Sequence, residues 1–294
     1  MPGMHRDRVE PTPRAKQHDR IRLAIQLAAA ALANGYAVGF ARGKIFTGSS
    51  KMVCIPVLNC DSCPGALSAL QAVAGGVKHN VSFYVLGTLM LFGVLLGRLI
   101  CGLLCPFGLV QDLMYRIPVR KLRVLQKIDK PLRCLKYVIL AVFVILLPVF
   151  AVDQFGIALP YFCKYICPAG TLEGGIPHLF MSEELRRLAG VLFGWKLGVL
   201  ITVLVGSMFI SRCFCRYLCP LGAFYSLFNR FSLYGLELDH AKCIGCGTCE
   251  SVCLMALDVR KNINSTECIR CGKCKAACPA GAIARKGRDC RRIL

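Results

Sequence analysis

The sequence has little charge and few histidines for its length. Charged residues make up only 18% of its 294 residues, whereas hydrophobic residues make up 55%. Such a composition excludes an ordinary soluble protein of this size and favours membrane spans. None of the five histidines lies inside a long apolar run, which excludes a haem held between two histidines within a membrane.

Acidic residues are also scarce. Sixteen Asp and Glu stand against 37 Lys and Arg, so the net charge is +21. Such a charge is typical of nucleic-acid binding, but here the basic residues lie between apolar runs, where they orient a membrane protein. We therefore expect contact with membrane lipid and no nucleic-acid partner. The sequence contains no nucleotide-binding motif, phosphate loop or Ser/His/Asp constellation, so a stand-alone enzyme is not indicated.

Four apolar runs predict a mainly α fold with a four-transmembrane-helix bundle. They cover residues 21–40, 81–97, 137–152 and 188–210. Fourteen Lys and Arg on one side of these runs against seven on the other place both termini in the cytoplasm of a multi-pass inner-membrane protein. Ala31 to Asn34 resembles a signal-peptide cleavage site, but an uncleaved first helix is preferred because an internal repeat needs it. Residues 1–20 and 286–294 are predicted to be polar tails.

Cysteine is what the sequence has in abundance. Eight of the twenty form two C-x2-C-x2-C-x3-C runs within a predicted α+β domain, residues 236–285. This is the spacing of a bacterial two-cluster ferredoxin, in which the fourth cysteine of each run binds the other [4Fe–4S] cluster. One cluster is then bound by Cys243, Cys246, Cys249 and Cys278, and the other by Cys268, Cys271, Cys274 and Cys253. Zinc knuckles are the less consistent alternative, since zinc ribbons lack the third close cysteine.

An internal repeat accounts for eight more cysteines within residues 21–235. Residues 98–108 and 212–222 align without a gap over Arg, two Cys, Pro and Gly, and two further Cys-Pro motifs follow the first and third apolar runs. Cysteines at i and i+4 share a helix face, and proline suits the first turn of a new helix. A parallel repeat then predicts two four-cysteine sites. We call them the inner site (Cys101, Cys105, Cys215 and Cys219) and the outer site (Cys60, Cys63, Cys163 and Cys167).

Each predicted site has alternatives. A further cluster is expected at the inner site, and buried cysteines acting as small hydrophobes are the alternative. At the outer site a fourth cluster is favoured over a redox-active dithiol or disulfides. The repeated Arg98 and Arg212 either offset the negative charge of a thiolate-bound cluster or anchor the helices at the interface. Cys54, Cys134, Cys213 and Cys290 have no assigned role.

On these motifs the sequence resembles the polyferredoxin-type membrane proteins, which carry C-x3-C-P motifs and a C-terminal double ferredoxin. This family includes the NapH-type subunit of periplasmic nitrate reduction, the membrane regulator of nitrous oxide reductase and an accessory protein of cytochrome oxidase assembly. The resemblance covers roughly residues 50–285. It implies electron transfer between the cytoplasm or the quinone pool and an outer redox partner. The sequence departs from the family in having cysteine motifs on both faces and no extra flavin or haem-binding domain.

We therefore expect a membrane-bound iron–sulfur electron-transfer protein with redox partner proteins on the cytoplasmic and outer faces. Two alternatives stay open: a transmembrane thiol–disulfide or metal reductase that uses the outer cysteine pairs, and a redox assembly factor or anchor. The hydrocarbon core is about 30 Å thick, which is long for one electron hop. A quinone between the repeats, or a partner subunit, is expected to bridge the two sites.

Overall fold

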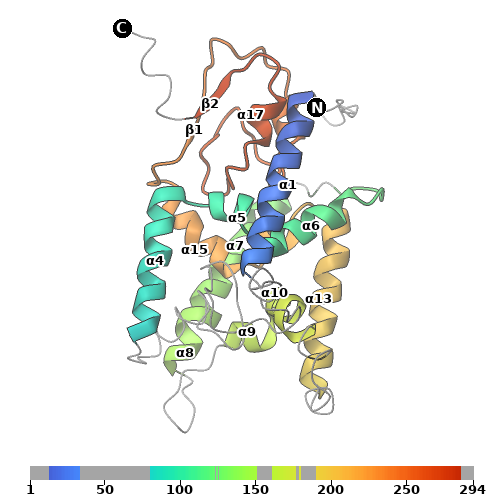
Figure 1. Cartoon of the computed structure of the whole chain (residues 1–294), viewed down its shortest axis with the longest axis vertical. Helices are drawn as coiled ribbons and strands as arrows, with labels where there is room; N and C mark the ends of the chain where they lie inside the picture. The colour runs from blue at the N-terminus through green and yellow to red at the C-terminus, as the bar shows by residue number, and fades with distance from the viewer. Residues whose placement is uncertain are drawn as a thin grey trace.

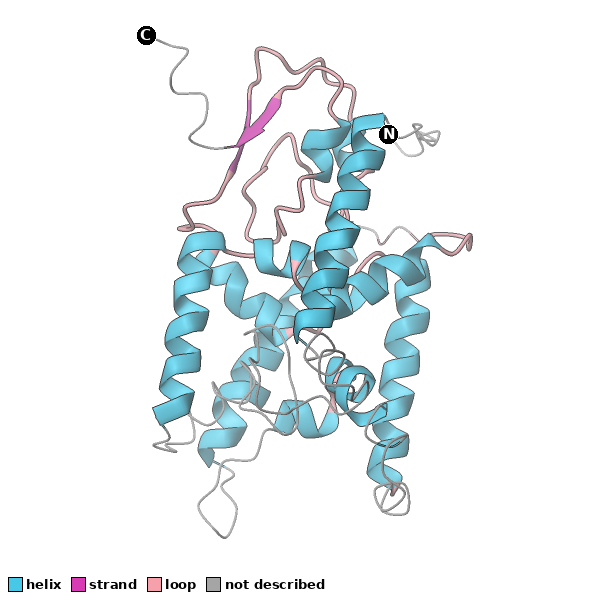
Figure 2. Ribbon diagram, viewed as in Figure 1, coloured by secondary structure: helices cyan, strands magenta, loops and turns pink. Residues whose placement is uncertain are grey.

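The computed structural model describes residues 13–33, 80–122, 124, 126–150, 161–176, 179 and 190–285. Within these ranges the protein is mainly helical, and the strands lie in the C-terminal domain, at the top of the view (Figures 1 and 2). The α+β character predicted for residues 236–285 and the helical character predicted for the rest are both confirmed.

Among the described residues, two helices are long and apolar enough to cross a membrane. One runs continuously through α7 (Gln126–Ile139), the π-helical η1 (Leu140–Leu146) and α8 (Leu147–Phe150), and the other is α13 (Val191–Phe209). In α4 (Asn80–Leu96) the apolar stretch is shorter, Leu86–Leu96. Large apolar side chains such as Leu91, Val138 and Ile201 are exposed on these helices, as expected of surfaces that contact lipid.

The N-terminal helix differs from its prediction. Helix α1 runs from Pro13 to Ala33, so residues 13–20 are not an unstructured tail. Two of its polar residues are buried rather than solvated: Arg22 forms an ion pair with Asp112 at 2.6 Å, and Gln26 Nε2 donates to Gly102 O at 3.2 Å. Hydropathy counting misses this, because the two polar residues lie one helical turn apart and their partners are 90 and 76 residues away in the sequence. Residues 34–40 of the predicted first span lie outside the described residues.

The Cys-Pro repeat folds as predicted at each described copy. Short helices α5 (Leu99–Leu103), α9 (Tyr161–Tyr165) and α14 (Cys213–Tyr217) each end just before a Cys-Pro pair. A second helix begins at the proline: α6 (Pro106–Arg116), α10 (Pro168–Gly170), which continues as π-helical η2 (Thr171–Gly175), and α15 (Pro220–Phe228). The cysteine before each proline is the N-cap residue, because its extended backbone leaves the sulfur free to accept from the first turn.

The C-terminal domain is small and held by two antiparallel strands. Strand β1 (Leu236–Leu238) pairs with β2 (Ile283–Arg285) in the register Leu236↔Arg285. Helices α16 (Thr248–Ser251) and α17 (Lys273–Ala277) each follow a glycine in the left-handed conformation, Gly247 and Gly272. The buried Leu236, Val259 and Ile283 form its own apolar core.

This domain is docked on the ends of the helices by hydrogen bonds that reach its loops. Asn229, just after α15, donates to Ser265 O at 2.7 Å and to Cys268 O at 3.0 Å. Ser211 donates to Leu254 O at 2.6 Å on the other side. Helix α1 runs alongside the domain (Figure 1), and its Asp19 lies 3.3 Å from Lys273 of α17. These contacts therefore hold the C-terminal domain in a defined position on the helical part.

Candidate metal centres

A backbone N–H reaches the sulfur of the second cysteine in each described Cys-Pro motif. Gly108 N donates to Cys105 Sγ at 3.4 Å, Gly170 N to Cys167 Sγ at 3.4 Å and Gly222 N to Cys219 Sγ at 3.3 Å. Hydrogen bonds from N–H groups favour the thiolate form, which is the metal-binding form of cysteine. The motif therefore places a hydrogen-bond donor that stabilises the thiolate, the metal-binding form, of its second cysteine.

The inner site gathers all four predicted cysteines. Each of Cys101, Cys105, Cys215 and Cys219 lies within electrostatic range of the other three. Burial, followed by the neighbouring Cys215 thiol, raises the pKa of both Cys105 and Cys219. Four buried thiolates would repel one another, so the arrangement suits a cationic centre that neutralises them.

The two halves of the repeat are interlocked at this site. Arg98 Nη2 of the first motif donates to Cys215 O of the second at 3.5 Å, and Arg212 Nη1 donates to Cys101 O at 2.8 Å. A Cβ added to Gly222 would lie 3.3 Å from Arg98, and one added to Gly108 would lie 3.5 Å from Arg212. Each glycine therefore lies directly against the arginine of the other motif, and the packing is tighter at Gly222.

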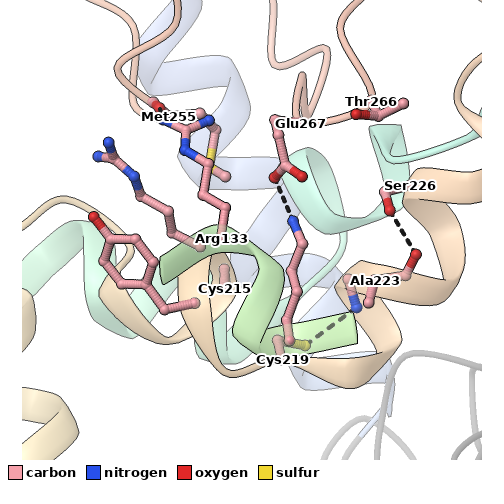
Figure 3. A network of polar contacts seen from close by, with 12 residues as sticks. Arg133, Cys215, Cys219, Ala223, Ser226, Met255, Thr266 and Glu267 are labelled. Carbon is pink, nitrogen blue, oxygen red and sulfur yellow. Dashed lines mark hydrogen bonds and ion pairs between the residues drawn. The ribbon is translucent and has the colours of Figure 1, made fainter. Parts of the chain in front are cut away.

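Both arginines are fully buried, which contradicts the reading of them as interfacial anchors. Arg212 forms a two-point ion pair with Asp112, at 2.9 and 2.8 Å. Arg98 Nη1 lies 3.0 Å from Glu267 Oε2, and Lys136 pairs with the same carboxylate. Figure 3 shows Glu267 reaching from the C-terminal domain towards the helices that carry Cys215 and Cys219. The arginines therefore place balanced positive charge beside the four thiols.

The second cluster site predicted in the C-terminal domain is a cavity in the structure. Four predicted thiol ligands line it together with apolar residues such as Leu254 and Ile269; they are Cys253, Cys268, Cys271 and Cys274. Backbone N–H groups donate to two of the sulfurs, from Leu257 to Cys253 at 3.5 Å and from Arg270 to Cys268 at 3.4 Å. The structure thus brings Cys253 of the first run to the second run, as the ferredoxin spacing predicts, and these residues fit a thiolate-bound cluster.

The other predicted ligand set of the C-terminal domain lies outside this cavity. Cys249 is buried in the domain core with Cys278 beside it, and it lies within electrostatic range of the exposed Cys246. Cys243 is half-buried on the loop that precedes α16. Among the described residues, no three His, Cys, Asp or Glu side chains lie close enough to surround a single metal ion. A cubane cluster is larger than one ion, so its thiolates stand farther apart.

Direct packing connects the C-terminal domain to the inner site. Gly102 lies beside Cys101 on α5, and a Cβ added to it would come within 2.5 Å of Ile269 O and 3.5 Å of Cys271 Cβ. Only glycine allows the loop that carries Cys271 to approach so closely. Cys271, a predicted ligand of one centre, therefore lies against the residue that follows Cys101, a predicted ligand of another centre.

The described half of the outer site lies deeper than predicted. Cys163 and Cys167 are buried in the same hydrophobic core as Cys101 and Cys215, and Cys167 lies within electrostatic range of Cys219. Their helices α9 and α10 pack against η1 and α13, within the two apolar spans. Non-helical backbone at such a depth is tolerated where protein covers it. Cys60 and Cys63, the other predicted members, lie outside the described residues.

Sequence reasoning missed several polar residues around the inner site. They are Arg22, Asp112, Gln111, Tyr225 and Glu267. The repeat itself contains a signal for two of them, because its constant offset continues beyond the glycine and aligns Gln111 with Tyr225. Gln111 Nε2 donates to Cys215 Sγ at 3.2 Å. Arg22 and Glu267 have no counterpart in the repeat and were not identifiable from it.

The sequence signature of a 4Fe-4S binding domain matches residues 81–124, 137–180 and 191–233, and that of a second 4Fe-4S binding domain matches 261–284. The chain therefore contains 4Fe-4S binding domains of two kinds. Each of the first three segments contains one C-x3-C-P motif, so the motif at Cys163 is of the same kind as the two at the inner site. The family resemblance suggested by the motifs is confirmed.

Relatives within this family include electron-transport and ferredoxin-type proteins. The uncharacterized protein MJ0750 of Methanocaldococcus jannaschii is 30% identical over 58% of this chain and 64% of its own length. The putative electron transport protein YccM of Escherichia coli is 28% identical over 63% of this chain and 49% of its own length. The methylamine utilization ferredoxin-type protein MauN of Methylorubrum extorquens is 27% identical over 63% and 58%. The matches thus span less than two thirds of these relatives, and no solved structure matches the chain.

Proposed function

We propose that this chain is a membrane-bound electron-transfer protein with four transmembrane helices and both termini in the cytoplasm. It moves electrons between a soluble partner at the C-terminal domain and a redox partner in the membrane or at the outer face. The contact between Gly102, beside Cys101, and the loop of Cys271 carries this proposal. The rate of electron transfer falls steeply with distance, and this contact brings the loop of one thiol-lined site against the helix that carries part of the other.

The chain's own residues provide the binding and the charge balance. Eight cysteines of the C-terminal domain would hold two [4Fe–4S] clusters, and the four of the inner site would hold a third. Each cluster takes up and releases one electron when bound. The buried Arg98 and Arg212 stabilise the negative charge of the thiolate set, and their carboxylate partners keep the arginines in place.

Cys163 and Cys167 extend this path towards the other membrane face. Because Cys167 lies close to Cys219, the cysteines form a buried series rather than two sites a membrane apart. A fourth cluster shared with Cys60 and Cys63, followed by a quinone or a partner subunit, would complete the route. The alternative of an outer dithiol reductase is disfavoured, since Cys163 and Cys167 are only 5% and 4% exposed and a substrate disulfide must reach its thiol.

The iron and acid-labile sulfide content of the full chain, purified without oxygen, tests the proposal. Two ferredoxin clusters alone give about eight sulfides per chain, the inner cluster raises this to about twelve, and an outer cluster to about sixteen. We expect at least twelve. A content of eight in fully loaded protein, with zinc or free thiols at the inner cysteines, would show that the inner site does not hold a cluster.

A further inference from the structure

A buried hydroxyl group beside the inner site has no hydrogen-bond partner among the described residues. The Tyr225 side chain, from α15, is fully buried, and its hydroxyl makes no hydrogen bond. Buried hydroxyl groups are nearly always paired, because losing contact with water without a replacement is unfavourable. The Cys101 thiol lies within electrostatic range of this hydroxyl. The unpaired hydroxyl therefore lies near a predicted ligand of the inner site.

The repeat supplies a counterpart that already makes such a contact. Gln111 lies six residues after Cys105, and Tyr225 lies six residues after Cys219. Gln111 Nε2 donates to Cys215 Sγ at 3.2 Å, while its carbonyl oxygen accepts from Phe214 N at 3.1 Å. In the second motif, Tyr225 occupies the position equivalent to Gln111, within electrostatic range of Cys101, the first cysteine of the other motif. The Gln111 amide already makes its hydrogen bonds, whereas the Tyr225 phenol has an O–H group that makes none.

The phenol is suited to donate and not to lose its proton. A phenol ordinarily titrates near pH 10, about three units above neutral, so its O–H stays intact near neutral pH. The Tyr225 ring is held edge-to-face against Phe224, with centroids 5.9 Å apart, which restricts its movement.

We propose that the Tyr225 hydroxyl donates a hydrogen bond to sulfur at Cys101 when the inner site is loaded, and that it raises the reduction potential of that site. The inference rests on the proposed inner cluster. A hydrogen bond to cluster sulfur stabilises the reduced, more negative state more than the oxidised state, so it favours electron uptake. Tyr225 is thus a tuning residue that acts through a ligand, and it does not bind iron.

The test measures a midpoint potential in full-length protein. The inner signal is first identified as the electron paramagnetic resonance signal that Cys105→Ser removes. Tyr225→Phe removes only the oxygen, and we expect it to keep the signal and lower its midpoint, by up to about tenfold in the one-electron equilibrium or about 59 mV. Tyr225→Met, which also lacks a donor, should shift the midpoint in the same direction.

Tyr217→Phe is the matched control. It removes a buried hydroxyl from the adjacent helix α14, but that hydroxyl donates to Asp129 Oδ1 at 2.7 Å and not to a cysteine. We expect no shift of the inner midpoint in this variant. An unchanged midpoint in both Tyr225 variants, with the inner signal intact, overturns the tuning role and leaves the proposed function standing. If no signal depends on Cys105, the proposed cluster itself fails.

Discussion

Glu267 of the C-terminal domain forms an ion pair with Arg98, with 3.0 Å between Oε2 and Nη1. It supplies a carboxylate that the half of the repeat containing Cys215 and Cys219 does not have. In the other half, Arg212 pairs with Asp112. The residue that the repeat aligns with Asp112 is Ser226, which has no charge. The Tyr137 hydroxyl lies 2.7 Å from Ser226 Oγ and 3.2 Å from Glu267 Oε1. It therefore links Ser226, which has no carboxylate, to Glu267, which provides one. The docked domain thus completes the charge balance of the inner site.

Glu267→Gln should weaken docking of the C-terminal domain. The change keeps the shape of the side chain but leaves Arg98 and Lys136 buried without a counter-charge. Removing one partner of a buried ion pair costs about 3–5 kcal/mol. We expect faster hydrogen exchange at the domain interface and a lower unfolding temperature. Glu237→Gln, an exposed position on strand β1 of the same domain, should change neither. Equal effects of the two substitutions would refute this role for Glu267.

The docking should also depend on pH. Burial alone would raise the pKa of the Glu267 carboxyl, but Arg98 and Lys136 reverse this and lower it. A carboxyl whose pKa is lowered by folding stabilises the folded state above its unfolded pKa, about 4.3, and this contribution is lost as the pH falls through the folded value. The stability difference between the wild type and Glu267→Gln should therefore be constant at neutral pH and shrink below about pH 4.3. Unfolding temperatures of both proteins across this range provide the measurement.

Gly102→Ala should separate the C-terminal domain from the inner site. The new Cβ would lie 2.5 Å from Ile269 O, which is closer than side-chain carbons come to a backbone oxygen, so the loop of Cys271 must move. We expect all clusters to be retained, because no ligand is changed, but reduction of the inner site through the C-terminal domain to be slower. Rapid-mixing optical or freeze-quench spectroscopy would follow this reduction.

Gly198→Ala on α13 is the control for that substitution, since an added Cβ there meets nothing within 4 Å. It should transfer electrons at the wild-type rate. If Gly102→Ala also keeps the wild-type rate, the Gly102–Cys271 contact is not the route between the two sites.

Local sequence patterns predicted the cysteine sites, but they did not predict the charged residues that surround them. The helix starts at Pro106, Pro168 and Pro220 follow from the fixed backbone of proline and the capping sulfur before it, both of which are local effects. The packing of α1 against Asp112, and the use of Glu267 in place of a carboxylate at Ser226, depend on contacts between distant segments. No periodicity encodes such contacts. Hydropathy therefore assigned Ile21 to Ala33 to a membrane span without revealing that Arg22 and Gln26 in it are buried against protein.

The membrane topology gives a further prediction. A reporter inserted after Leu122, between α6 and α7, should be cytoplasmic, and one inserted after residue 183 should be outside, because the excess of Lys and Arg flanks the first position. Alkaline phosphatase and green fluorescent protein fusions report the two sides in opposite ways. The reverse result at either position would contradict the proposed orientation and with it the assignment of the C-terminal domain to the cytoplasm.

The inner site makes the last prediction, because its four cysteines come from two halves of the repeat. If they bind one cluster, Cys105→Ser and Cys219→Ser should each abolish the same paramagnetic signal, and the double substitution should cause no further loss, since residues that act as one unit are not additive. Cys134→Ser, at an exposed cysteine on α7, should leave every signal intact. Each C-x3-C pair acting alone, as a dithiol or a two-thiolate site, would instead give two separate and additive losses. Loss of the ferredoxin-domain signals in either single variant would also contradict the prediction, because Cys253, Cys268, Cys271 and Cys274 line a separate cavity that these substitutions do not touch.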